Sequence, residues 1–218
     1  MERYKGMVKE FKEKYPEKFL TESETFKCIH RGDRLFVGTG CGEPQYLLNA
    51  LAEYVDANPK AFFDAEVLQV WTLGVAPYAE PRFLRNFRHN SFFVGDNTRQ
   101  AVNEGLADYT PIFLSQVPGL FYNGLIKIDV ALVQASPPDR NGYMSLGVSV
   151  DITKAGVECA SRVICQVNSN MPRVHGDTFV HIDEVDYLID HDEPLLEYGA
   201  VVTDEIAQGI GKYVSRIV

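Results

Sequence analysis

The 218-residue chain carries 21 Lys and Arg against 30 Asp and Glu, a formal net charge of −9 at pH 7. This charge repels a phosphate backbone, and no basic patch with interleaved aromatic residues offsets it, so the composition excludes a nucleic-acid-binding role. The N-terminal segment is charged throughout and is neither a secretory signal nor a membrane span. With four cysteines and no CxxC spacing, the sequence predicts a cytoplasmic protein with reduced, buried thiols and no membrane partner.

Helices and strands alternate along the first half of the sequence. Thr21 and Glu24 form a capping-box pattern, and Pro44 suits the first turn of a helix because its missing N–H group has no partner to lose there. Helices are predicted over residues 2–14, 21–28, 44–55 and 98–107, and strands over residues 34–37, 66–73, 90–94 and 111–115.

The second half contains the clearest fold signal. Residues 127–135 (KIDVALVQA) are almost continuously apolar, as in a central strand that is covered on both faces. A helix over residues 152–161, capped by Asp151, and a strand over residues 162–167 follow. Strand, helix and strand in this order form a βαβ unit, which pairs its strands in parallel. We therefore predict an α/β fold with an open, mostly parallel sheet.

The end of the sequence differs in character from the rest. We predict an α/β domain over residues 1–189, followed over residues 190–218 by a linker and a first helix. Residues 190–203 are acidic and contain Pro and Gly, and residues 204–218 have apolar side chains at helical spacing. The helical pattern continues to the last residue without a capping glycine, which predicts a further C-terminal domain. The alternative is that this helix packs back onto the same domain.

A glycine-rich turn, LFVGTGCGEP, connects the strand over residues 34–37 to the next helix. It lacks the third glycine of a dinucleotide-binding turn, because Glu43 occupies that position, and it has no Walker lysine. Free backbone amides near a helix start suit a carboxylate or a thioester oxygen. A plain structural turn is the alternative interpretation.

Three polar side chains elsewhere are candidates for contact with a ligand. Thr72 closes a predicted strand, at the end of a parallel sheet where ligands bind. Asn97 and Arg99 open a predicted helix, and Arg99 could hold a carboxylate through two hydrogen bonds. The alternatives are an ordinary strand threonine and an exposed helix-start arginine.

Other reactive residue types receive structural interpretations. Cys41 lies near a helix start, which lowers a thiol pKa, but no histidine is close in sequence, so we expect a buried small residue. His175 and His181 lie near acidic residues, yet residues 178–182 alternate like a strand. We therefore expect a hydrogen-bonded structural histidine at position 181 and no metal site. No serine of residues 136–151 sits in G-x-S-x-G, which disfavours nucleophile-elbow hydrolase chemistry.

Taken together, a series of short motifs resembles the N-terminal half of the acetyl-CoA hydrolase/transferase family, above all its 4-hydroxybutyrate and butyrate CoA-transferases. The motifs are Glu43-Pro44, Thr72-Leu73-Gly74, Thr98-Arg99, Ser136-Pro137-Pro138-Asp139 with Gly142, Gly147-Val148-Ser149 with Asp151, Val167-Asn168, Met171-Pro172 and residues 176–181 (GDTFVH). The resemblance covers nearly the whole chain and implies a NagB/RpiA/CoA-transferase-like fold with helices on both faces of the sheet.

The family resemblance also implies a chemistry. In class I CoA transfer, a glutamate carboxylate attacks an acyl-CoA thioester and forms an acyl-glutamyl anhydride, with release of CoA. CoA then attacks the anhydride, which releases the first carboxylate and leaves an enzyme–CoA thioester. An incoming carboxylate takes over this CoA, as in acetate metabolism. The family's glutamate lies in the C-terminal half, so no catalytic residue is carried over to this chain. The implied partners are an acyl-CoA, a small carboxylate and a C-terminal CoA-transferase domain, and the possibility of a homo-oligomer stays open. CoA is a substrate, and no tightly bound cofactor is expected.

This leads to a provisional set of substrate-binding residues and four hypotheses. The substrate-binding residues are predicted to be Gly38, Thr39, Gly40, Thr72, Asn97 and Arg99. The first hypothesis is the N-terminal domain of a CoA-transferase, inactive alone, and the second is a CoA-ester hydrolase of the same family. The third is a stand-alone module that binds a carboxylate or CoA ester, and the fourth is one subunit of a two-chain enzyme.

Overall fold

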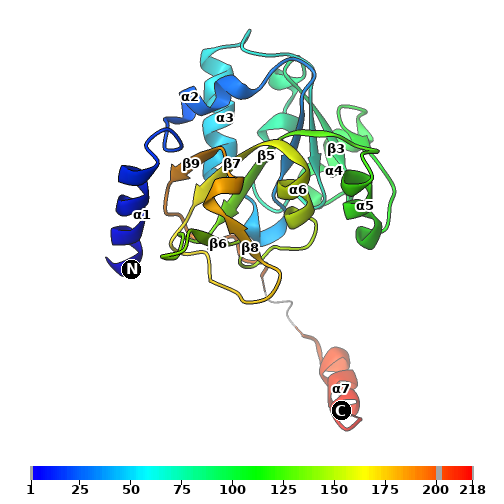
Figure 1. The fold of residues 1–218 in the computed structure, drawn as a ribbon. Coiled ribbons are helices and arrows are strands. Elements are labelled where there is room, and N and C mark those ends of the chain that lie inside the picture. The colour runs from blue at the N-terminus through cyan, green and yellow to red at the C-terminus, as the bar shows by residue number, and fades with distance from the viewer. Residues whose placement is uncertain (1, 200–202, 218) are drawn as a thin grey trace.

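The computed structural model describes residues 2–199 and 203–217, and its centre is a seven-stranded parallel sheet (Figure 1). The strands are ordered β4-β3-β2-β1-β5-β7-β9, and every neighbouring pair is parallel. Their bounds are β1 (Arg34–Val37), β2 (Ala65–Gln69), β3 (Phe87–Ser91), β4 (Asp108–Tyr109), β5 (Ile128–Ala135), β7 (Ala160–Val167) and β9 (Tyr187–Asp190). A small antiparallel pair is formed by β6 (Tyr143–Ser145) and β8 (Phe179–His181). The predicted α/β class and parallel sheet are confirmed.

The strand order contains one reversal of direction. From β1 the chain builds outward through β2 and β3 to the edge strand β4, then returns to place β5 on the other side of β1 and continues to β9. The carboxyl ends of β1 and β5 therefore border a topological switch point, the place where open α/β sheets bind their ligands. The glycine-rich turn follows β1 directly, so the fold brings it to this point.

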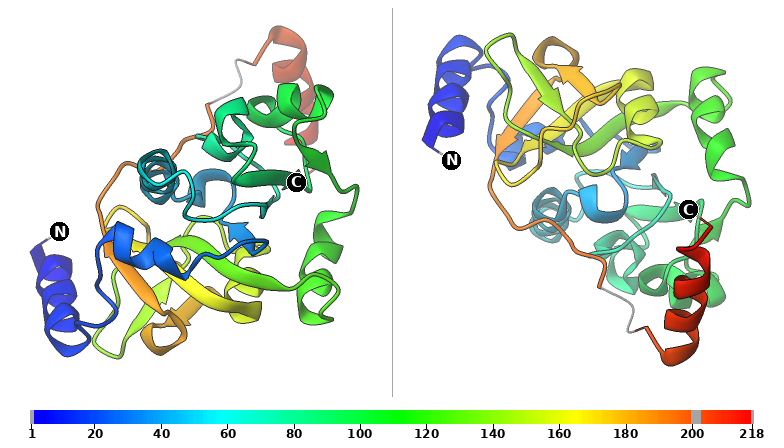
Figure 2. Two further views of the ribbon diagram at one scale, coloured as in Figure 1. Left: turned by 90° about the horizontal axis from the view of Figure 1, so that it is seen from above. Right: turned by 90° about the horizontal axis from the view of Figure 1, so that it is seen from below.

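Helices cover both faces of the sheet (Figure 2). The α-helices are α1 (Glu2–Lys14), α2 (Glu22–Thr25), α3 (Gln45–Ala57), α4 (Asp96–Asn103), α5 (Val117–Tyr122), α6 (Thr153–Cys159) and α7 (Glu205–Val214). Short 3₁₀ turns are formed by Phe26–Cys28, Gly40–Gly42, Pro77–Ala79, Pro81–Phe83, Leu114–Gln116 and Ile182–Glu184. Side chains on β1 alternate between the two layers: Leu35 and Val37 join the core under α3, and Phe36 joins the core under α5 and α6.

Most predicted elements are present, with shifted ends. The βαβ unit is confirmed as β5, α6 and β7, and the capping box of Thr21 and Glu24 closes both of its hydrogen bonds. Pro44 is the residue before the first helical position of α3, not inside its first turn. Asp151 precedes the helix cap, which is Ile152, although its carboxylate accepts a 3.1 Å hydrogen bond from the amide of Thr153.

The predicted strand over residues 111–115 is wrong. The edge strand β4 is two residues long and ends before this segment, and a 3₁₀ turn and helix α5 follow. Pro118 lies in the first turn of α5, where its missing N–H group removes no helical hydrogen bond, so the proline starts a helix here. The short strands β6 and β9 were not predicted.

Helix α7 is separate from the sheet domain in Figure 1. Asp204 caps it by accepting a 2.7 Å hydrogen bond from the amide of Ala207, and the helix ends at Val214, not at the last residue. Ile206 is 73% exposed and Ile210 is 59% exposed, and no side chain of α7 is buried among the described residues. The division of the chain near residue 190 stays a prediction, as does a further domain.

Candidate functional site

The glycine-rich turn is fixed to the strands on both sides of β1. The amide of Gly38 donates to the carbonyl oxygen of Leu132 on β5 at 2.9 Å, and the amide of Gly40 donates to that of Trp71 at 2.9 Å. The Thr39 hydroxyl lies 3.0 Å from the Trp71 carbonyl oxygen and 2.9 Å from its amide nitrogen. Gly40 has a φ of +58°, a conformation that favours glycine. The turn therefore holds the segment that follows β2.

Gly42 has a packing role in this turn. A Cβ atom at position 42 would lie 2.5 Å from the Cβ of Ser149, whose hydroxyl donates to the carbonyl oxygen of Thr39 at 2.8 Å. We expect Gly42→Ala to lower the free energy of unfolding by about 1–3 kcal/mol, because two backbone segments must separate. Urea denaturation measures the loss. Gly6→Ala on α1 is the matched control, since no atom lies within 4 Å of its added Cβ, and it should leave stability unchanged or raise it. Equal stability of the two variants would contradict this packing role.

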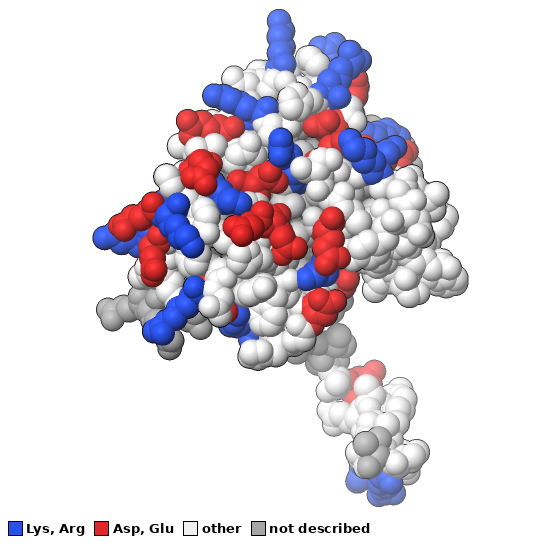
Figure 3. All heavy atoms as spheres, in the orientation of Figure 1, with Lys and Arg blue, Asp and Glu red and all other residues white. Residues whose placement is uncertain are grey.

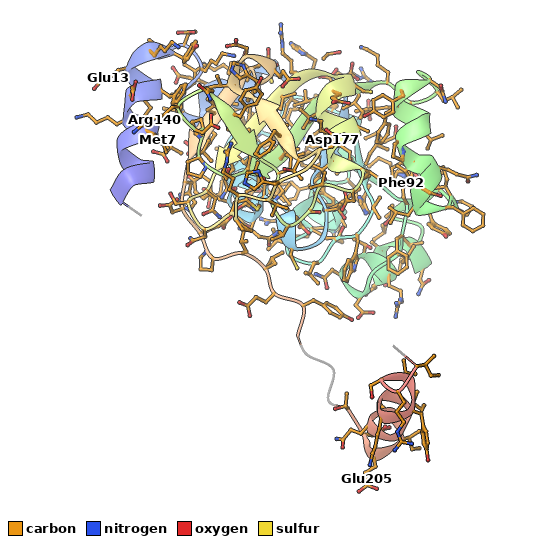
Figure 4. The ribbon with its side chains drawn as sticks, turned by 60° about the horizontal axis from the view of Figure 1, so that its bottom comes forward. Met7, Glu13, Phe92, Arg140, Asp177 and Glu205 are labelled. Atoms are coloured by element: carbon orange, nitrogen blue, oxygen red, sulfur yellow. The ribbon has the colours of Figure 1, made fainter. Side chains whose placement is uncertain are left out.

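A cavity of about 590 Å³ lies beside the turn, at the carboxyl ends of β2 and β3. Its lining is mainly apolar. It comes from the segments after the two strands, from the starts of α4 and α5, and from one residue of the segment that follows β9. The lining residues are Val70, Trp71, Thr72, Leu73, Phe92, Phe93, Gly95, Asp96, Asn97, Arg99, Ile112, Leu114, Val117 and Tyr198. Figure 4 labels Phe92 beside α5, at the end of the molecule away from Met7 and Glu13 of α1.

Three of the six predicted binding residues line this cavity. Thr72 is buried and its hydroxyl donates to Gln69 Oε1 at 2.5 Å. The Asn97 amide donates to the carbonyl oxygens of Leu73 and Gly74 at 2.8 and 2.5 Å. Arg99 lies at the rim, where its Nη1 is 3.0 Å from Asp96 Oδ1 and its side chain is 59% exposed.

The other three predicted binding residues have a different position. Gly38, Thr39 and Gly40 are buried and are absent from the lining; they contact the backbone of Trp71 and the end of β5. They support one wall of the cavity from behind. Direct contact of any of the six with a substrate stays a prediction.

One part of the surface, over α5, is poor in charge. In Figure 3 the face over α5 carries almost no charged side chains. Large apolar side chains are exposed on α5 or next to it in the sequence, namely Phe113, Leu114, Tyr122 and Leu125, and Phe93 of the cavity lining is also exposed. Two of these side chains, Phe93 and Leu114, also line the cavity. Single exposed apolar residues are normal, whereas larger exposed apolar patches are typical of a ligand or protein contact.

Glu43 lies next to the cavity wall and was not among the six predicted binding residues. It is 1% exposed, and its Oε2 accepts hydrogen bonds from the amides of Leu73 and Gly74 at 2.9 and 3.2 Å. Its Oε1 is buried and has no hydrogen-bond partner among the described residues. Burial raises the pKa of this carboxyl to about 7, although the amides of Gly74 and Leu73 act in the opposite direction. Glu43 thus connects the glycine-rich turn to the cavity wall and can hold a proton near neutral pH.

A row of buried side-chain amides underlies the site. Gln69 donates to the carbonyl oxygen of Gly38 at 2.9 Å, and Gln134 donates to that of Glu43 at 3.2 Å. Asn168 donates to Gln134 Oε1 at 2.5 Å, and Gln166 donates to Glu193 Oε1 at 2.7 Å. These residues lie at the ends of β2, β5 and β7 and satisfy groups that the sheet leaves unpaired there. Polar residues at the ends of otherwise apolar strands were the available sequence signal.

The histidine and cysteine interpretations fare differently. His181 is a structural residue as predicted: its Nε2 is 2.8 Å from the carbonyl oxygen of Asn141, and its Nδ1 accepts from the amide of Asp183. Among residues 2–199 and 203–217, no group of three or more His, Cys, Asp or Glu side chains could hold a metal ion. The prediction of buried thiols is wrong in part: Cys165 is buried, but Cys41 and the other two cysteines are only half-buried, because they lie on helices and loops and not in a central strand.

Comparison with known proteins gives the class and then the family. Over 94% of the chain the fold matches half of RipA from Yersinia pestis, with a TM-score of 0.84 and 29% identity; the chain covers 49% of that structure. A 4-hydroxybutyrate CoA-transferase from Porphyromonas gingivalis matches over 86% of the chain and 43% of its own length, with a TM-score of 0.69 and 26% identity. The fold is therefore that of the CoA-transferases.

The chain belongs to the acetyl-CoA hydrolase/transferase family, whose N-terminal domain matches residues 1–197. It is 39% identical to the 4-hydroxybutyrate coenzyme A transferase of Clostridium kluyveri, over 96% of the chain and 48% of that protein. It is 34% identical to a succinyl-CoA:acetate/propanoyl-CoA:succinate CoA transferase of Fasciola hepatica, over 93% of the chain and 42% of that protein. The chain thus spans about half the length of these relatives. Within the described residues, no helix combines the length and hydrophobicity needed to cross a membrane.

Proposed function

We propose that this chain is the N-terminal domain of an acyl-CoA:carboxylate CoA-transferase of the acetate, butyrate or 4-hydroxybutyrate type. It supplies one wall of the acyl and carboxylate pocket, and the catalytic glutamate lies in a C-terminal half, so this chain alone is inactive. The observation that carries the proposal is the apolar cavity at the carboxyl ends of β2 and β3, with one arginine at its rim. Coenzyme A acts as a substrate and no tightly bound cofactor takes part.

The geometry of the site supports this assignment of roles. A thioester and a carboxylate both need hydrogen-bond donors beside an apolar space for the acyl chain. Arg99 is the one lysine or arginine among the lining residues of the described cavity. Its partner Asp96 is 88% exposed, so an incoming carboxylate can displace Asp96 from Arg99 at little cost in free energy. The exposed apolar face over α5 is suited to cover by the second half of the enzyme.

A substitution at the cavity rim tests the role of Arg99. In the native polypeptide, Arg99→Ala should raise the KM of the carboxylate acceptor about tenfold, because one charged hydrogen bond is lost at a partly exposed position. The control is Arg82→Ala, an equally exposed arginine that pairs with Asp56 and Glu80 away from the cavity. An unchanged acceptor KM for Arg99→Ala would make this arginine structural.

The mass of the native polypeptide tests whether a second half exists. An antibody raised against this chain should detect a band of about twice its 24.5 kDa in source cells. A band at 24.5 kDa would contradict a single-chain enzyme. Affinity purification would then separate a two-chain enzyme, which retains a partner with the glutamate, from a stand-alone binding module, which does not.

A CoA-ester hydrolase is the second candidate function. The family includes this activity, and one relative that is 28% identical over 63% of the chain is an acetyl-CoA hydrolase of Neurospora crassa. The two candidates differ in the group that attacks the enzyme-bound intermediate: an incoming carboxylate takes over CoA in the transferase, and water replaces that acceptor in the hydrolase. The apolar lining favours the transferase, because it keeps water out of the acyl pocket.

A further inference from the structure

Residues 191–198, which follow β9, begin with a fixed attachment to the sheet domain. The amide of His191 donates to the carbonyl oxygen of Val167, the last residue of β7, at 3.1 Å. The His191 ring stacks on the ring of Tyr46 in α3, with centroids 3.6 Å apart and planes 8° apart. The start of the predicted linker is therefore held against both β7 and α3.

Glu193 is the centre of this attachment. Its Oε1 accepts a hydrogen bond from the amide of Tyr46, in the first turn of α3, at 3.1 Å and from Gln166 Nε2 at 2.7 Å. Its carbonyl oxygen accepts from the side-chain amides of Asn168 and Asn170 at 2.8 and 3.0 Å. A carboxylate at a helix start is also stabilised by the helix dipole. One acidic residue thus joins this segment to α3 and to the end of β7.

The same hydrogen bonds continue to the cavity wall. Asn168 donates to the carbonyl oxygen of Glu193 and, at 2.5 Å, to Gln134 Oε1. Gln134 donates to the carbonyl oxygen of Glu43 at 3.2 Å, and the Glu43 carboxylate holds the segment that follows β2. The attachment of residues 191–198 and the wall of the cavity therefore belong to one hydrogen-bonded network.

Residues 191–198 also reach the cavity itself. They start at β9, on one edge of the sheet, and end with Tyr198 in the cavity lining near β2 and β3. β9 and β2 are four strand positions apart in the sheet, which is about 19 Å at the usual strand spacing. Eight extended residues span at most about 27 Å, so a largely extended path covers this distance. Figure 2 shows the segment in orange, passing α3 between β9 and α7.

The contact at the far end of the segment is weak by itself. The ring of Tyr198 meets Trp71 edge-on with centroids 5.3 Å apart, and Tyr198 is 65% exposed. Resting on the function proposed above, we propose that Glu193 is a positioning residue for substrate binding. It anchors residues 191–198 across the carboxyl ends of the strands, so that Tyr198 forms the outer side of the cavity mouth against Trp71.

Acrylamide quenching of the 218-residue chain tests this anchor without any ligand. Trp71 is the single tryptophan, so its fluorescence reports on the cavity mouth alone. Glu193→Ala should raise the quenching constant at least about twofold, because the released segment no longer holds Tyr198 over Trp71. Tyr198→Ala should produce an increase of similar size while the anchor stays in place.

Three further variants separate the anchor from general effects. Glu193→Gln keeps the Oε1 acceptor and should retain wild-type quenching, and Glu197→Ala, which removes the same charge from an exposed residue of the segment, should change nothing. Asn170→Ala removes one hydrogen bond to the segment from an exposed position and should give a smaller increase, which keeps the test valid if Glu193→Ala does not fold. Wild-type quenching in both Glu193→Ala and Asn170→Ala would overturn the anchor. Wild-type quenching in Tyr198→Ala would overturn the position of that ring.

Transfer kinetics of the native polypeptide separate this proposal from the proposed function. Glu193→Ala should raise the KM of the carboxylate acceptor about fivefold and change kcat by less than about twofold, since one aromatic contact at the mouth is lost. Glu193→Gln should leave both values unchanged. An unchanged KM in Glu193→Ala would overturn the role in substrate binding and leave the function intact. Absence of transfer by the wild type would refute the function, and the quenching results would still decide whether Glu193 positions Tyr198.

Discussion

Phe36→Ala should lower the free energy of unfolding by about 3–5 kcal/mol, the loss typical of a fully buried aromatic residue. Phe36 is 0% exposed and lies on β1, the strand beside the switch point. Its ring contacts that of Phe121 on α5 edge-on, with centroids 5.8 Å apart, and a Cβ at Gly156 on α6 would lie only 2.5 Å from it. One ring therefore joins the sheet to two helices, and truncation leaves a cavity that these elements cannot close.

Urea denaturation at neutral pH measures this effect, with the slope of the transition as a check on two-state behaviour. The control is Phe113→Ala, because Phe113 is 77% exposed and its truncation should change stability by less than about 0.5 kcal/mol. A loss below about 1 kcal/mol for Phe36→Ala would contradict the position of this ring in the core.

Glu43→Gln should change how stability depends on pH. Burial raises the pKa of Glu43 in the folded protein to about 7, from an ordinary value of 4.5. The folded state therefore binds this proton more tightly than the unfolded state. The corresponding stability is fully present below pH 4.5 and is lost as pH rises through 7, by about 3 kcal/mol in total.

The measurement is the free energy of unfolding of the wild type minus that of Glu43→Gln, followed from pH 4.5 to 8. This difference should fall by about 3 kcal/mol, because the glutamine cannot ionise. Glu53→Gln is the control, since Glu53 is exposed on α3, and its profile should follow the wild type. Parallel profiles for the wild type and Glu43→Gln would contradict a buried titrating carboxyl at position 43.

The sequence was sufficient to predict the architecture where a strand or helix is long enough to show a clear apolar or periodic pattern. The apolar run of β5 is followed by a helix and then by β7, and this order predicts that β5 and β7 pair in parallel. Because parallel sheets are buried, it also predicts helices on both faces of the sheet. The strand predicted after β4 was wrong because Pro111 followed by apolar residues resembles the start of a strand. The role of Pro118 as the start of a helix depends on tertiary packing, which the sequence pattern does not show. Strands of three or four residues, such as β6 and β9, have too few residues for a periodic pattern.

The candidate site was predicted in part, for a similar reason. Thr72, Asn97 and Arg99 were identified because they end a strand or begin a helix, and such positions meet at one edge of a parallel sheet. The burial of Glu43 could not be predicted, because it depends on the amides of Leu73 and Gly74, which are thirty and thirty-one positions away in the sequence. The apolar depth of the cavity also depends on Val117 at the start of α5, and the sequence analysis predicted no helix there.

Group transfer by the native polypeptide tests the central claim most directly. The measurement follows butyryl-CoA and isotopically labelled acetate, and quantifies labelled acetyl-CoA, butyrate and free CoA. The proposed function predicts labelled acetyl-CoA and butyrate in equal amounts, with no product when acetate is left out. Free CoA and butyrate formed without acetate would contradict a transferase and indicate a hydrolase, and no turnover at all would contradict both.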